Sequence, residues 1–61
     1  MTDLSAKELL ALESQLRQEQ LMIKAFKTMA EMTSDPQLKA KYEQVASRHQ
    51  GHYSRLFEFL Q

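Results

Sequence analysis

The chain has 61 residues, with one Gly, one Pro and no Cys, and its eight Lys and Arg balance its eight Asp and Glu. A chain of this size buries too little surface to be stable without a disulfide, a metal or a partner, and the lack of cysteine excludes a disulfide and a thiolate site. Because the basic residues are scattered and no apolar run approaches the ~20 residues of a membrane span, we expect neither nucleic-acid nor membrane binding.

The first predicted helix covers about residues 5–33 and opens with a complete N-terminal signal. Ser5 is placed as the N-cap, and Glu8 three residues later completes a capping box. Leu4 and Leu9 have the spacing of a hydrophobic staple. These signals predict that the helix begins directly after Ser5.

A turn at about residues 33–35, inside the stretch TSDPQ, separates the first predicted helix from the second. Asp35 can offer its carboxylate to the free amides of a helix start. Pro36 suits the first helical position, where a missing N–H costs nothing. The second helix is therefore predicted over about residues 36–60, and one hairpin domain over residues 1–61.

Both predicted helices carry a seam whose members recur at alternating steps of three and four, as in a left-handed helical bundle. The seam of the first helix consists of Leu9, Leu12, Leu16, Glu19, Ile23, Phe26, Ala30 and Thr33. The seam of the second consists of Leu38, Tyr42, Val45, His49, His52, Leu56 and Phe59. The seams are widened on one flank by Met22, Met29, Ala46, Tyr53 and Leu60.

Stripes of this width exceed what a contact between two helices needs. We therefore predict an all-α fold in which two antiparallel hairpins pair as a homodimer into a four-helix bundle. The expected core and dimer interface is formed by Leu9, Leu12, Leu16, Met22, Ile23, Phe26, Met29, Tyr42, Val45, Tyr53, Leu56 and Phe59. A helical adaptor that docks a partner helix in place of its own copy has the same pattern and stays an alternative.

Three polar residues interrupt the seams at one height. Glu19 and His49 each lie fifteen residues from Ser34 in the turn, and His52 follows one helical turn later. Two imidazoles and one carboxylate would suit iron(II), zinc or manganese. The alternative is a polar layer in which the imidazoles and the carboxylate bond to one another and fix the helix register.

The remaining features leave the biochemical role open. Gly51 lowers helix propensity by ~1 kcal/mol beside the histidines, and it either permits close approach of another group or is simply tolerated. Three apolar residues fall outside the seam: Leu10, Leu21 and Phe57. They either form a surface for further assembly or are simply scattered apolar residues. No serine pairs with a histidine, so we expect no catalytic residue and no enzyme.

The spacing of the polar residues resembles the half-site of ferritin-like di-iron proteins, in which a Glu precedes a Glu-x-x-His by about thirty residues. Here the second motif reads His-x-x-His, at His49 and His52. A dimer would then hold two carboxylates where that family has four. The resemblance implies a ferritin-like bundle and no transfer of oxygen chemistry.

A closer resemblance is to the small ferritin-like spore coat proteins, the group that includes spore coat protein F. The stretches that carry it are KELLALESQLRQEQLMIKAF and DPQLKAKYEQVASRHQGHYSRL. It implies a structural role in coat assembly, other coat proteins as partners, location in the spore coat and no catalytic residue or cofactor. Independently of this resemblance, the lack of a signal-peptide pattern in residues 1–10 predicts a cytoplasmic protein.

Overall fold

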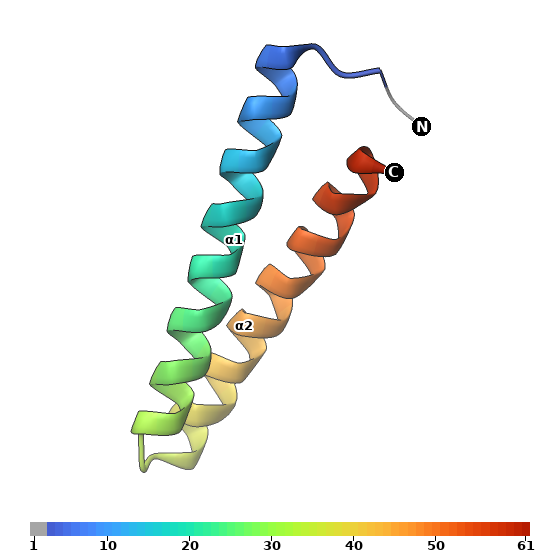
Figure 1. The fold of residues 1–61 in the computed structure, drawn as a ribbon. Coiled ribbons are helices and arrows are strands. Elements are labelled where there is room, and N and C mark those ends of the chain that lie inside the picture. Colours follow the sequence, from blue (N-terminus) through green and yellow to red (C-terminus); the bar gives the residue numbers. More distant parts are fainter. Residues whose placement is uncertain (1–2) are drawn as a thin grey trace.

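A computed structural model describes residues 3–61, which form an antiparallel helical hairpin (Figure 1). Helix α1 spans Ala6–Met32 and helix α2 spans Pro36–Phe57, followed by a 3-10 turn, η1, at Glu58–Leu60. These residues contain no strand, so the prediction of an all-helical hairpin is confirmed. None of the helices in the described part of the chain combines the length and apolarity needed to cross a membrane.

Helix α1 begins where it does because Ser5 and Glu8 form a reciprocal cap. The Ser5 hydroxyl accepts a hydrogen bond from the Glu8 backbone N–H at 3.1 Å, and the Ser5 backbone N–H donates to Glu8 Oε1 at 3.0 Å. The bond from the Ser5 backbone holds the pKa of the Glu8 carboxyl below its ordinary value. Two backbone donors that the helix itself cannot satisfy are thus paired.

We expect Ser5→Ala to destabilise the protein by about 1 kcal/mol, because the Glu8 amide loses its acceptor. Thermal unfolding followed by circular dichroism measures the change. Ser34→Ala, in the exposed turn, is the control and should leave the midpoint almost unchanged. An equal loss in both variants would show that the cap contributes nothing.

The connection to α2 is fixed by local hydrogen bonds. Asp35 Oδ1 accepts from the backbone N–H groups of Gln37 at 2.9 Å and Leu38 at 3.3 Å. Lys39, in the first turn of α2, reaches back across the connection. Its Nζ donates to the carbonyl oxygen of Ala30 at 3.1 Å, near the end of α1. The turn therefore caps the end of one helix and the start of the next.

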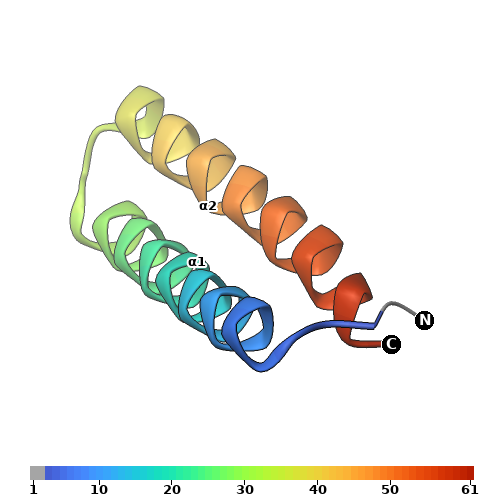
Figure 2. The same cartoon turned by 90° about the horizontal axis from the view of Figure 1, so that it is seen from above.

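The hairpin is a rod one layer thick. Its Cα atoms extend over 46 × 16 × 10 Å, and Figure 2 shows the two helices lying side by side with nothing above or below them. Among the described residues, the buried side chains are Leu16, Glu19, Ala30 and Ala46. A stable domain generally encloses its core between two layers, so this single layer lacks the second layer that would complete its core.

Much of the predicted core and interface is still in contact with water in the single chain. Leu9, Met22 and Phe59 are 38%, 40% and 51% exposed. The half-buried members of the set are Leu12, Ile23, Phe26, Met29, Tyr42, Val45, Tyr53 and Leu56. Only Leu16 of the twelve is buried by the hairpin itself.

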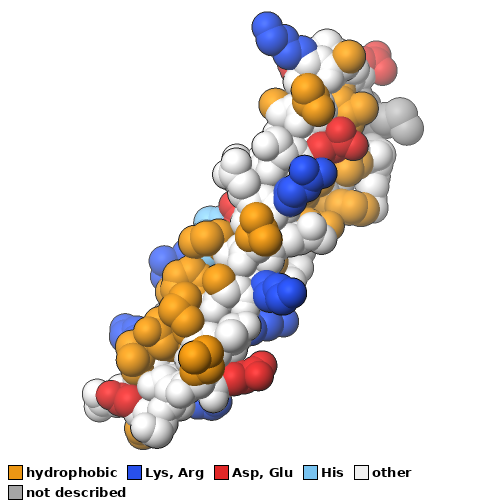
Figure 3. Space-filling view, turned by 60° about the vertical axis from the view of Figure 1, so that its left-hand side comes forward, with side chains coloured by type: hydrophobic (Ala, Val, Ile, Leu, Met, Phe, Trp, Pro, Cys, Tyr) orange, Lys and Arg blue, Asp and Glu red, His pale blue; other side chains and the backbone are white. Residues whose placement is uncertain are grey.

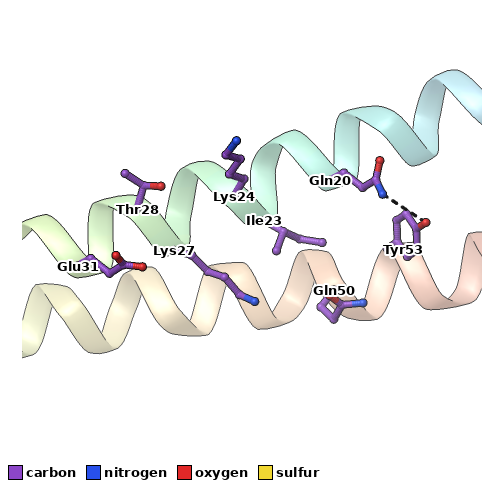
Figure 4. Close-up of a pocket in the computed structure, with 8 residues that line it drawn as sticks. All are labelled: Gln20, Ile23, Lys24, Lys27, Thr28, Glu31, Gln50 and Tyr53. Carbon is purple, nitrogen blue, oxygen red and sulfur yellow. Dashed lines mark hydrogen bonds between the residues drawn. The ribbon is translucent and has the colours of Figure 1, made fainter.

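One long face of the hairpin is polar. Two adjoining grooves of about 520 and 430 Å³ run along it between the helices. Across the first groove, the Gln20 side-chain amide of α1 donates to the Tyr53 hydroxyl of α2 at 3.4 Å (Figure 4). The charged residues that line the two grooves are Lys24, Lys27, Glu31, Lys39 and Glu43.

The flank of α1 on the other side of its buried seam is uncharged. Over residues 18–29 its members recur at alternating steps of four and three and so form one continuous line on the helix; they are Gln18, Met22, Ala25 and Met29. In Figure 3 hydrophobic side chains form a stripe along one edge of the rod, reaching from the turn end to an exposed imidazole. We call this flank of α1, defined by the four residues above, the uncharged face.

Gly51 has an ordinary helical backbone, and the hairpin itself gives no reason for a glycine there. A Cβ atom at this position would meet no atom within 4 Å, and the φ angle of Gly51 is not positive. No group of the hairpin itself therefore approaches Gly51 closely. Simple tolerance, or the approach of a second molecule, is left.

We expect Gly51→Ala to stabilise the protein by about 0.5–1 kcal/mol, because alanine loses less backbone entropy on folding and meets no neighbour. The reverse change at an exposed position of the same helix, Ala40→Gly, should destabilise it by a similar amount. Thermal unfolding measures both. A loss of stability in Gly51→Ala would show that another molecule packs at this position.

Candidate metal centre

The structure brings together the three polar seam residues, Glu19 of α1 and His49 and His52 of α2. One ligand atom of each residue lies within 4.8 Å of those of the other two. Glu19 Oε1 is 2.7 Å from His49 Nδ1 and 3.6 Å from His52 Nδ1. Among the described residues, this is the one group of three His, Asp or Glu side chains whose ligand atoms lie close enough together to hold a metal ion.

The register of the hairpin and the packing of the rings place these side chains. Glu19 and His49 are equidistant from the turn, so antiparallel helices put them at one height, and His52 follows on the same face. The Phe26 ring stacks on His49, with centroids 6.1 Å apart and planes inclined by 11°. The two imidazoles meet edge to face at 5.5 Å. The orientation of His49 is thus set from both sides.

Glu19 is a satisfied carboxylate in a mostly apolar seam. Its residue is only 8% exposed, and it accepts hydrogen bonds from His49 Nδ1–H at 2.7 Å and from the Gln15 amide at 3.3 Å. The hydrogen bond from His49 holds the pKa of the Glu19 carboxyl below its ordinary value of 4.5, with burial opposing the shift. Among the described residues, no buried side-chain nitrogen or oxygen lacks a partner, so a polar layer needs no ion to be complete.

We expect the free energy of unfolding to fall as the pH drops through 4.5 and below, because the lowered pKa of Glu19 makes its carboxylate easier to protonate in the unfolded chain. Glu19→Gln should flatten this dependence, leaving the part due to Glu8. Urea unfolding at a series of pH values measures it. An unchanged slope in Glu19→Gln would contradict the role of the His49 bond.

The donor set fits a divalent ion. Two imidazoles and a carboxylate suit iron(II), zinc or manganese. With bonds of about 2.0–2.2 Å, two ligands of a tetrahedral zinc ion lie roughly 3.3–3.6 Å apart. The distance of 3.6 Å between His52 and Glu19 already matches this spacing, whereas the 2.7 Å between His49 and Glu19 is that of a hydrogen bond. Binding an ion between all three would replace the proton that His49 shares with Glu19.

A cavity of about 320 Å³ adjoins the cluster. Gln15, Glu19, His52, Arg55 and Leu56 line it, and the His52 side chain is 40% exposed. An ion could therefore reach the cluster from this side, and three protein ligands would leave it an open coordination position. The two outer members of the cavity were not predicted from the sequence, although Gln15 precedes Glu19 by four residues and Arg55 follows His52 by three.

No protein-family model, no curated protein and no solved structure matches the chain. The resemblance to the small ferritin-like spore coat proteins therefore stays a prediction, carried by the motifs in residues 7–26 and 35–56. The structure shows a helical hairpin and does not test this resemblance.

Proposed function

We propose that the protein is a non-enzymatic assembly protein whose working unit is a homodimeric four-helix bundle. The observation that carries this proposal is the uncharged face, beside which the seams of both helices are only partly buried. A single-layer hairpin with such a face lacks the second layer of its core. A second copy supplies that layer.

The energetics favour pairing through the uncharged face. Each Å² of apolar surface removed from water contributes about 25 cal/mol, and Met22 at 40% exposed still has surface to bury. The four residues of the uncharged face include no charged side chain, so burying these side chains removes no charge of α1 from water. The polar face, with Lys24, Lys27 and Glu31 along its grooves, would require charges to leave water.

A second copy is a better occupant than an unrelated helix for two reasons. The seams of both helices keep the same alternation of three and four along the hairpin, so a copy of equal length meets them throughout. A two-fold interface also needs only one self-complementary patch, and an uncharged patch is self-complementary in charge. The resemblance to spore coat proteins supports a structural role for such a dimer, with other coat proteins as further partners.

Size-exclusion chromatography with light scattering tests the dimer. At micromolar concentration we expect twice the chain mass of 7.1 kDa. A folded, helical species of 7.1 kDa would contradict the homodimer and favour the adaptor that docks a foreign helix.

Metal binding by Glu19, His49 and His52 is the second candidate function, and the observation that favours it is the mutual approach of their ligand atoms to within 4.8 Å. Elemental analysis of untagged protein, purified without chelator, measures the ion content. One ion of iron, zinc or manganese per chain, which is a pair per dimer, supports this function. Metal-free protein that also fails to take up added zinc contradicts it and leaves the polar layer as the role of the cluster.

A further inference from the structure

We propose that the cluster of Glu19, His49 and His52, once it holds a divalent ion, also binds a small oxyanion, and that Arg55 and Gln15 hold this anion in the adjoining cavity. The inference rests on the proposed metal-binding function. It goes further, because it assigns roles to two residues outside the ligand set and names the class of molecule that the site accepts.

The shape of the site fixes the side from which an additional ligand can come. Glu19 and His52 both line the cavity of about 320 Å³, whereas His49 does not. His49 is instead covered by the ring of Phe26, which stacks on it at 6.1 Å. The open coordination position of an ion held by the three ligands therefore faces the cavity, toward Arg55.

The charge of the loaded site favours an anion. A divalent ion beside the single carboxylate of Glu19 has a net charge of about +1, and the guanidinium of Arg55 adds another positive charge. No Asp or Glu other than Glu19 lines the cavity. Within residues 3–61, no carboxylate lies within ion-pair distance of Arg55, so its five N–H donors are free for a ligand.

The donors select the kind of anion. The planar fork of a guanidinium matches the two oxygens of a carboxylate and two of the oxygens of a tetrahedral oxyanion. Gln15 uses one N–H of its amide on Glu19 Oε2 at 3.3 Å, and the second N–H remains available. The cavity of about 320 Å³, which is open to solvent and also lined by Leu56, has ample room for an anion of a few non-hydrogen atoms.

Cobalt(II) is a suitable probe because its visible spectrum reports the number and kind of its ligands. The wild-type protein is loaded with cobalt(II) and titrated separately with acetate and with sulfate, at constant ionic strength kept with perchlorate. We expect a saturable spectral change with at least one of the two anions. Acetate alone would assign a carboxylate ligand, and sulfate alone would assign a tetrahedral oxyanion.

Variants then assign the anion to the cavity. Arg55→Gln should weaken anion binding by about tenfold or more, the effect of removing a hydrogen bond to a charged group, while cobalt(II) affinity changes little. Gln15→Leu should weaken it less. Arg48→Gln, seven residues earlier on the same line of α2 and outside the cavity lining, is the matched control and should behave as wild type.

The outcomes separate the two proposals. If the protein binds no cobalt(II), the metal-binding function and this inference both fail. If cobalt(II) binds but neither anion changes its spectrum, the metal function stands and the oxyanion site is overturned. An anion response of equal strength in wild type, Arg55→Gln and Arg48→Gln overturns the roles of Arg55 and the cavity.

Discussion

Replacing both Met22 and Met29 with glutamate should convert the dimer into single chains and lower the thermal stability of the fold. In a bundle of two hairpins the change places four carboxylates between the helices, on a flank of α1 that has no cation of its own to pair with them. An uncompensated buried charge costs several kcal/mol, more than the net stability that a small dimer can lose. Sedimentation velocity measures the mass, and circular dichroism measures the helix content and unfolding midpoint.

A matched pair of substitutions tests whether the effect belongs to the uncharged face. Leu21 and Thr28 lie on the same helix with the same spacing of seven residues, and both are exposed and outside the buried seam. The variant Leu21→Glu, Thr28→Glu therefore adds the same charge without placing it in the interface, and it should stay dimeric. Dimers of equal strength in both double variants would mean that the copies pair elsewhere, and loss of the dimer in both would point to net charge instead.

The second large effect concerns the polar cluster. Replacing Glu19, His49 and His52 together with leucine should abolish metal uptake and leave the metal-free protein at least as stable as wild type, since an apolar layer substitutes well for a buried polar one. The single change His49→Leu should be strongly destabilising, by about 3 kcal/mol, because it removes the 2.7 Å hydrogen bond of a buried carboxylate. Elemental analysis and thermal unfolding read out the two effects.

Gln50→Leu is the control for this series, because Gln50 neighbours His49 in sequence but lines the polar grooves on the other face. Its metal content should equal that of wild type. If the triple leucine variant still retains metal, the ion binds at a site other than this cluster. A destabilised triple variant would mean that the polar layer itself contributes to the stability of the hairpin.

The polar layer and the metal centre differ by one proton, the one on His49 Nδ1. Without an ion, the proton on His49 Nδ1 is shared with Glu19 at 2.7 Å and completes the hydrogen bonding of the buried carboxylate. An ion that uses both residues displaces this proton, so metal uptake should become stronger as the pH rises. If the copies pair through the uncharged face, one bundle contains two such clusters, with four imidazoles and two carboxylates.

The sequence predicts the hairpin well because its signals are local. Ser5 with Glu8, and Asp35 with Pro36, act within one helical turn, so their spacing alone locates both helix starts. The meeting of Glu19 with His49 follows from counting residues on either side of the turn. The predicted end of the second helix is less sharp, since the α-helix stops at Phe57 and the last turn tightens into η1.

The surroundings of the cluster were not predictable in the same way. Gln15 and Arg55 join the cavity because of how side chains from two helices pack against each other, which spacing on one helix does not specify. The contact of Phe26 with His49, at 6.1 Å, likewise depends on the distance and rotation between the helices. The sequence did place Met22 and Met29 on one line of the first helix, but which surface covers them depends on a second molecule.

Native mass spectrometry of the untagged protein, purified without chelator and then supplied with zinc, counts chains and ions together and so tests whether two hairpins pair through the uncharged face. We predict a species of two chains, each of 7.1 kDa, that persists at micromolar concentration and gains ions only when Glu19, His49 and His52 are intact. A folded species of one chain under the same conditions would contradict the assembly through the uncharged face.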